Sequence, residues 1–168
     1  MFKYVFFICI AGIFFGKNAA AQIQLAQLKY SGGGDWYEYV EASSADLFNY
    51  PYVHITGHGN IVLSNAEAEN LRRYLEAGGF IHISDNYGLD QFVRNEFAKV
   101  LPNLEWKLVP LTHPIYNVPY KFPNGLPKIH EHDGEQPSGL GLFLNNKLVV
   151  FYDLESDLSD GWEDEAVH

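Results

Sequence analysis

Composition and charge restrict the partners and chemistry open to this chain. Among its 168 residues, 11 are basic and 21 acidic, and the formal net charge of −10 argues against nucleic acid or anionic lipid as a partner. The single cysteine, Cys9, lies in a segment that we expect to be removed, so the mature chain has no disulfide, thiolate metal site or cysteine nucleophile.

The first 21 residues have the features of a secretory signal peptide. Lys3 precedes an apolar run at residues 4–16, and three alanines at residues 19–21 supply the small side chains of a cleavage site. We expect cleavage after Ala21 and export to the periplasm or cell envelope, with residues 22–168 forming a single domain. An uncleaved membrane anchor is the alternative, although the apolar run falls short of the roughly 20 residues that a membrane span requires.

Strand and helix patterns alternate through the first part of the domain. Apolar runs predict strands at Ile23–Tyr30, Tyr52–Thr56 and Phe80–Ser84. Helices are expected at Ser64–Ala77, where Ser64 and Glu67 form a capping box, and at Leu89–Leu101. Strands that alternate with helices indicate a parallel sheet with right-handed crossovers, so the predicted fold class is α/β.

The second part of the domain begins with an irregular segment. Residues 110–137 show neither helical nor strand periodicity, which is typical of a functional loop or lid. A hairpin is then expected from Leu140–Leu144 and Lys147–Tyr152, turning at the pair Asn145 and Asn146. The acidic segment 153–165 lacks the glycine of a calcium-binding EF-hand loop, because Leu158 stands at that place, and a solvated acidic loop is expected instead.

Polar clusters follow three of the predicted strands. Because ligands of open parallel sheets bind beyond the carboxyl ends of the strands, these clusters predict one crevice. Its candidate ligand-binding residues are Asp35, His58, Asn60, Asp85, Asn86 and His113. The run GGGD lacks both dinucleotide and P-loop spacing, so we interpret it as a flexible turn that carries Asp35. A solvated turn is the alternative interpretation of His58.

A second group of residues has the chemistry of a metal site. In IHEHDG, alternate residues of an extended segment share a face, so two imidazoles and a nearby carboxylate could hold a divalent ion such as zinc. The candidate ligands are His58, Asp85, His130, His132 and Asp133. A hydrogen-bonded loop explains this segment equally well. His54 and His82 lie inside strands, and we expect buried imidazoles bonded to neighbours rather than ligands.

Several stretches together resemble one bacterial family, that of domain of unknown function 4159. They are LKYSGGGDWY, LFNYPYVHITGHGN, AENLRRYLEAGGFIHISDNYG, HPIY, FPNGLPKIHEHDG and SDLSDGWED. The resemblance implies a three-layer sandwich with a mostly parallel sheet, similar to flavodoxin and to class I glutamine amidotransferases. Compared with similar proteins, we expect the chain to lack part of the first crossover, including a strand, between Trp36 and Ala45, and to lack the C-terminal helix.

Three functions are compatible with these patterns. The first is an exported, non-catalytic domain that binds a small polar ligand or assists another protein, since the cysteine nucleophile of an amidotransferase is absent. Aromatic side chains for stacking a sugar-like ligand are Tyr116, Tyr120, Phe122 and Trp162. The second is a metal-dependent hydrolase that uses the His/Asp cluster. The third is a structural partner of cell-envelope proteins. A Ser–His–Asp triad is not indicated, because no GxSxG elbow is present.

Overall fold

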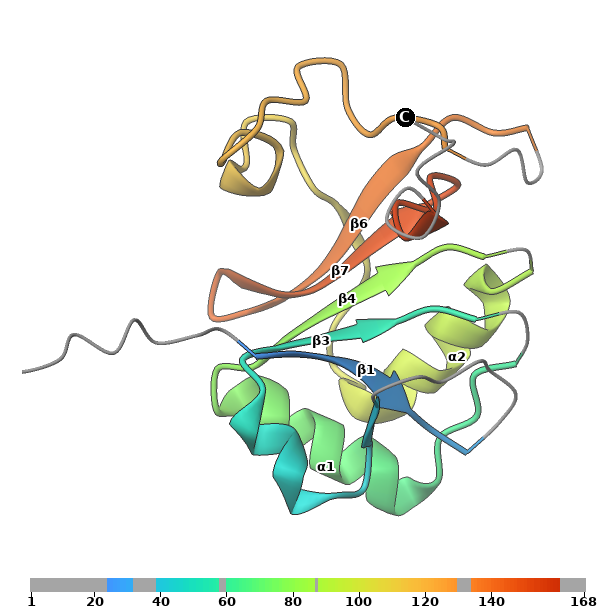
Figure 1. Cartoon of the computed structure of the whole chain (residues 1–168), viewed down its shortest axis with the longest axis vertical. Helices are drawn as coiled ribbons and strands as arrows, with labels where there is room; N and C mark the ends of the chain where they lie inside the picture. The colour runs from blue at the N-terminus through green and yellow to red at the C-terminus, as the bar shows by residue number, and fades with distance from the viewer. Residues whose placement is uncertain (1–23, 32–38, 58–59, 87, 130–133, 161–168) are drawn as a thin grey trace, which may run out of the picture.

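The computed structural model describes residues 24–31, 39–57, 60–86, 88–129 and 134–160. One seven-stranded sheet with the order β2-β1-β3-β4-β7-β6-β5 organises them (Figure 1). The elements, in chain order, are β1 Leu25–Lys29, β2 Tyr39–Glu41, η1 Ala45–Asn49, β3 Tyr52–Ile55, α1 Asn65–Glu76, β4 Phe80–Ser84, α2 Asp90–Val100, β5 Lys107–Leu108, η2 Pro114–Tyr116, β6 Ser138–Leu144 and β7 Lys147–Leu154.

The central strands of the sheet are parallel, as predicted. β1 pairs in parallel with both β2 and β3, β3 with β4, and β4 with β7. β6 and β5 extend the sheet beyond β7 as antiparallel neighbours. The chain passes from β1 to β2 in one direction and then returns across β1 to β3. The α/β class is therefore confirmed, and the strand order changes direction between β1 and β3.

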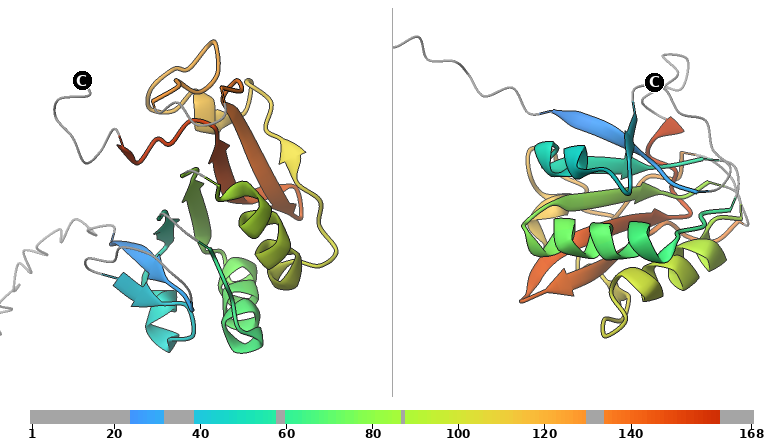
Figure 2. Two further views of the ribbon diagram at one scale, coloured as in Figure 1. Left: turned by 90° about the vertical axis from the view of Figure 1, so that its right-hand side faces the viewer. Right: turned by 90° about the horizontal axis from the view of Figure 1, so that it is seen from below.

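Both described α-helices cover the same face of the sheet (Figure 2). α1 connects β3 to β4, and α2 leads from β4 towards β5 at the far edge, so the two connections run in the same direction and their helices lie on one side. The Arg72 guanidinium of α1 donates to the carbonyl of Val100 in α2 at 2.7 Å. Leu71 of α1 and Phe97 of α2 are fully buried in a common core against the sheet.

The ends of α1 form as the sequence predicts. Ser64 is the N-cap, and a reciprocal capping box links it to Glu67. Gly78 follows the helix with a φ of 104°, a left-handed conformation that favours glycine. The hairpin prediction is also confirmed, because Asn145 and Asn146 turn with φ angles of 49° and 63° between β6 and β7.

The opposite face of the sheet is covered partly by irregular chain rather than by helices. A second core contains Val109 and Tyr116 from the segment after β5, packed on Leu148 and Phe151 of β7. Tyr116 is only 2% exposed, so it is a core residue and cannot serve as a platform for stacking a ligand. Ile115, Phe122 and Leu126 are partly buried against this cluster, so part of the predicted loop contributes to a core of the domain.

The region before β3 corrects one expectation. The chain was expected to lack a strand between Trp36 and Ala45, but Tyr39–Glu41 forms the edge strand β2 and pairs with β1. Three residues are too few for periodicity to reveal a strand. The connection from β2 to β3 contains only the short 3₁₀ helix η1, with buried Leu47.

Among the described residues, no helix has the length and apolar character to cross a membrane.

Candidate functional site

The carboxyl ends of four parallel strands meet at one edge of the sheet, which we call the carboxyl edge. Its described residues include Ser31 after β1, Gly57 after β3, Asp85 after β4 and Glu155 after β7. Because these strands are adjacent and parallel, the segments that follow them diverge from a common edge (Figure 1). The predicted crevice around GGGD, GHGN and SDN stays a prediction, because residues 32–35 and 58–59 lie outside the described residues.

Two buried aspartates lock the ends of β4 and β7 together. Asp153 is fully buried and accepts hydrogen bonds from His82 Nε2 at 3.0 Å, Ser84 Oγ at 2.7 Å and the Asp85 N–H at 2.8 Å. Asp85 in turn accepts from the Tyr152 hydroxyl at 2.6 Å. Each strand end therefore supplies donors to the aspartate of the other, which compensates the cost of burying two carboxylates.

A chain of hydrogen bonds runs from Asp153 across the face opposite the helices. Because the carboxylate accepts, His82 Nε2 carries a proton, and its Nδ1 lies 2.8 Å from the Tyr52 hydroxyl. Burial, and then the charge of Asp153, raise the pKa of Tyr52, so its hydroxyl stays protonated and keeps its hydrogen bond to Nδ1. The prediction that His82 is a buried imidazole bonded to neighbours is confirmed.

His54 lies beside His82 on the same face of the sheet. The ring centroids are 5.0 Å apart, and His54 is 9% exposed. Burial, followed by repulsion from His82, lowers the pKa of His54 from 6.5 to about 3. His54 is therefore buried, as the sequence predicts, and its lowered pKa makes the imidazole neutral at physiological pH.

The turn after β7 is buried rather than solvated, which corrects the prediction for the acidic segment. Glu155 and Asp157 are 6% and 0% exposed, and their φ angles of 63° and 51° are left-handed. Such angles cost about 1 kcal/mol each in non-glycine residues. The turn is held in place by the Glu155 N–H, which donates to Asp85 Oδ2 at 2.7 Å, and by the Ser159 N–H, which donates to Ser84 Oγ at 3.1 Å.

This turn is also tied to the segment before β6. Lys128 forms an ion pair with Glu155 at 2.7 Å, and the Ile129 N–H donates to the Ser156 carbonyl at 3.1 Å. The Ser156 hydroxyl donates to the carbonyl of Pro127 at 2.5 Å. Residues 127–129 therefore reach the carboxyl edge, although the same segment begins at the opposite end of the sheet.

Two glutamates hold the segments that follow β1 and β3. Glu67 accepts from the backbone N–H and the hydroxyl of Ser31, both at 3.0 Å. Burial opposes its charge, but hydrogen bonds from Ser64 and Ser31 outweigh burial and lower the pKa of Glu67. Glu96 accepts from the buried Leu63 N–H at 2.7 Å. Together with Asp85 and Asp153, these glutamates fix backbone N–H groups in the segments that follow β1, β3, β4 and β7.

Of the predicted ligand-binding residues that the structure describes, three lie at the carboxyl edge and one, His113, lies at the opposite end of the sheet. Asp85 and Asn86 are buried at the carboxyl edge, and Asn60 is exposed after β3. His113 lines a pocket with Tyr52 and Phe80, the first residues of β3 and β4, and so lies at the opposite end of the sheet. Asp35, His58, His130, His132 and Asp133, predicted for the ligand or metal site, lie outside the described residues.

Sequence reasoning missed the residues that brace the edge. The sequence places Asp153 in a solvated loop, although Asp153 stands directly at the end of an apolar run, which is the same signal that identifies Asp85. The metal hypothesis is represented among the described residues only by Asp85, whose two oxygens accept from Tyr152 and Glu155. Within the described residues, no group of three or more acidic, histidine or cysteine side chains is arranged to hold a metal ion.

Comparison with known proteins identifies the family of this chain but does not identify an activity. A family model described as "Domain of unknown function (DUF4159)" matches residues 34–168, which is most of the chain. No curated protein matches the chain.

Proposed function

We propose that this chain, which belongs to the family Domain of unknown function (DUF4159), binds a small, uncharged, polar ligand at the carboxyl edge of its parallel sheet. The observation that carries the proposal is the set of buried carboxylates that fix the strand-following segments. Glu67 holds Ser31, Asp85 holds Glu155, and Asp153 holds both Asp85 and Leu158. Such bracing preorganises a site for its ligand.

The strand order supports the same location. The parallel strands run in the order β2-β1-β3-β4-β7, which corresponds to the order of flavodoxin-like folds. Ligands of that fold bind at the carboxyl edge where the order changes direction, here between β1 and β3. We propose a flavodoxin-like or amidotransferase-like relationship on this ground. Without a mature cysteine, an amidotransferase nucleophile is absent, which favours binding over glutaminase chemistry.

The chemistry of the edge favours an uncharged ligand. The described polar groups at this edge include the hydroxyl of Thr56 and the amides of Asn60 and Asn86. Glu67, Asp85 and Asp153 accept hydrogen bonds from backbone N–H groups, and Lys128 is paired with Glu155. Hydroxyl-rich ligands such as sugars suit hydroxyl and amide partners. We propose Asp35 and His58, which the sequence assigns to the segments after β1 and β3, as additional ligand contacts.

A thermal-shift screen of neutral sugars, polyols and zwitterionic amino acids tests the proposal. A bound compound is expected to raise the melting temperature, and calorimetry should then show that Asp35→Ala or His58→Ala weakens binding at least tenfold, equivalent to about 1.4 kcal/mol. His113→Asn is the matched control, since His113 lines a pocket at the other end of the sheet. Equal affinity in all variants would place the ligand elsewhere.

A metal-dependent hydrolase remains the second candidate, for one specific reason. The bond from Ile129 to Ser156 brings the start of the IHEHDG motif beside the turn that Asp85 holds. Here we propose His58, His130, His132, Asp133 and Asp85 as ligands of a divalent ion. Metal analysis of the purified protein separates the candidates: a stoichiometric transition metal that is lost in His130→Ala supports the hydrolase, and its absence supports ligand binding alone.

We further propose that the domain is exported and acts in the periplasm or cell envelope after cleavage behind Ala21. Mass spectrometry of the protein recovered from the envelope fraction is the test. A mature chain that begins at Gln22 supports export and cleavage, whereas an intact Met1 contradicts cleavage.

A further inference from the structure

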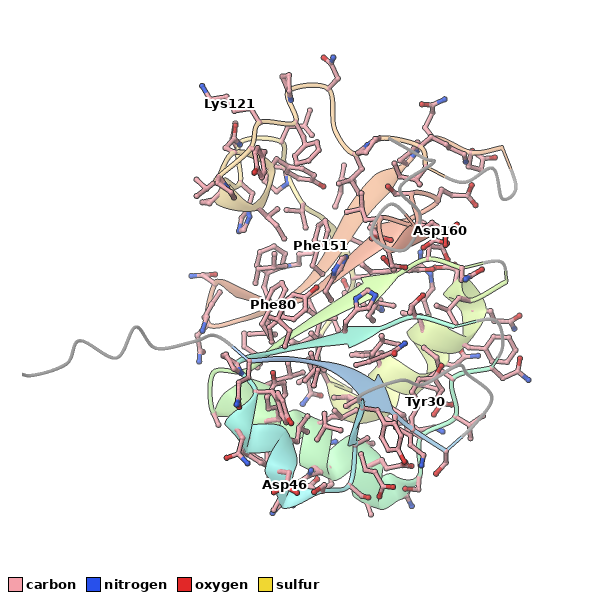
Figure 3. The ribbon with its side chains drawn as sticks, in the orientation of Figure 1. Tyr30, Asp46, Phe80, Lys121, Phe151 and Asp160 are labelled. Atoms are coloured by element: carbon pink, nitrogen blue, oxygen red, sulfur yellow. The ribbon has the colours of Figure 1, made fainter. Side chains whose placement is uncertain are left out.

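A separate pocket of about 610 Å³ lies at the amino ends of the strands, which we call the amino-edge pocket. In Figure 3, Phe80 of this pocket and Asp160 of the carboxyl edge lie at opposite ends of the sheet. The pocket is lined by Tyr52, Phe80, His113, Ile115, Asn146, Lys147 and Leu148. Its volume falls within the range of small-molecule sites. The ligand site proposed above does not include it.

The walls of the amino-edge pocket offer flat aromatic surface. The rings of Tyr52 and Phe80 are stacked, with centroids 6.0 Å apart and an interplanar angle of 23°. The Tyr52 hydroxyl is hydrogen-bonded to His82, so this polar group points along the sheet. The Tyr52 ring is the part of the side chain that is available to line the pocket. Leu148 and Ile115 add aliphatic surface. A planar apolar body fits these walls.

The polar groups of the pocket are donors of hydrogen bonds. His113 Nδ1 accepts from the Ile115 N–H at 3.2 Å, so in a neutral ring the proton resides on Nε2. Lys147 is exposed and forms no ion pair with any described residue, and Asn146 contributes an amide beside it. No aspartate or glutamate among the described residues lines the pocket, although the chain has a net charge of −10. Charge complementarity therefore favours an anionic group on the ligand.

From this combination we propose that the amino-edge pocket binds a small aromatic carboxylate. The ring of the ligand packs on Tyr52 and Phe80, and its carboxylate accepts from Lys147 and from His113 Nε2. This assignment gives His113, predicted from the sequence as a ligand-binding residue, a role at a second site. The proposal for the amino-edge pocket is independent of the proposal for the carboxyl edge. Of the residues that line the pocket, only Tyr52 is linked to the buried carboxylates of that edge, through the hydrogen bond of its hydroxyl to His82.

Phenylacetate is a suitable probe, with phenylacetamide as its uncharged counterpart. Titration followed by ¹⁵N-resolved NMR is expected to shift the amides of His113, Ile115 and residues 146–148, and phenylacetamide should bind at least tenfold more weakly than phenylacetate. Lys147→Met should lower the affinity for phenylacetate by about tenfold, since charge-assisted hydrogen bonds are among the stronger ones. Lys107→Met, which removes the same charge from the exposed strand β5, should leave the affinity unchanged.

His113→Asn tests the second donor while retaining an acceptor for the Ile115 N–H, and it should weaken phenylacetate binding several-fold with an unchanged melting temperature. The proposal is overturned by any of three results: no binding of phenylacetate, equal binding of phenylacetate and phenylacetamide, or amide shifts confined to the carboxyl edge. Equal effects of Lys147→Met and Lys107→Met would also overturn it, because they would indicate attraction by net charge alone.

Discussion

Lowering the pH from 7 to 5 should destabilise the folded domain through His54. In the fold its pKa is lowered from 6.5 to about 3, so the folded protein does not bind a proton there in this interval. The unfolded chain does, because its imidazole titrates near 6.5. The unfolded state therefore binds more protons, and the free energy of unfolding must fall as the pH falls.

The expected size of this effect follows from proton linkage. At pH 7 about a quarter of the unfolded imidazole is protonated, whereas at pH 5 nearly all of it is. The difference corresponds to about 2 kcal/mol of stability lost at this one residue. The loss continues at about 1.4 kcal/mol per pH unit until the pH approaches the folded pKa of about 3.

Urea denaturation at pH 7 and pH 5 measures the effect when wild type is compared with His54→Gln. The variant has no titrating ring at this position, so its stability should fall by about 2 kcal/mol less than that of wild type over the interval. Lys107→Met, on the exposed strand β5, changes no imidazole; it is the control and should follow wild type. Equal losses in wild type and His54→Gln would refute the claim that His54 is buried and neutral.

Three substitutions test the packing and bracing by urea denaturation at pH 7. Asp153→Asn should cost about 3 kcal/mol, because it replaces a fully buried acceptor with a group that opposes the surrounding donors. Glu67→Gln should cost about 1 kcal/mol by weakening the helix cap and the bonds to Ser31, and unchanged stability would contradict that role. Gly79→Ala should cost about 2 kcal/mol or more, since the added methyl would lie 2.2 Å from the Tyr74 ring; a neutral effect would indicate a looser core.

The sequence predicts the repetitive part of the fold well. Phe80–Ser84 has the same bounds in the structure, and the helix predicted at Ser64–Ala77 is found at Asn65–Glu76 with its capping box. Both depend on local patterns of burial and capping that a short window contains. β2 and β5 were missed because strands of three and two residues have no measurable period.

The candidate site was predicted less completely, because it depends on contacts between residues that are far apart in the sequence. Asp85 was recognised because it directly follows an apolar run. Asp153 was not, because its burial depends on His82 and Ser84, about 70 residues earlier in the chain. His113 was grouped with the carboxyl edge because sequence order cannot show which end of the sheet a long irregular segment visits.

Amide chemical-shift mapping tests most directly the proposal that the carboxyl edge binds a small polar ligand. With the strongest compound from the thermal-shift screen at saturation, the account predicts that the largest shifts fall on Ser31, Thr56, Gly57, Asn86 and residues 155–160. Shifts concentrated on other parts of the sheet, or the absence of any bound compound in the screen, would contradict it.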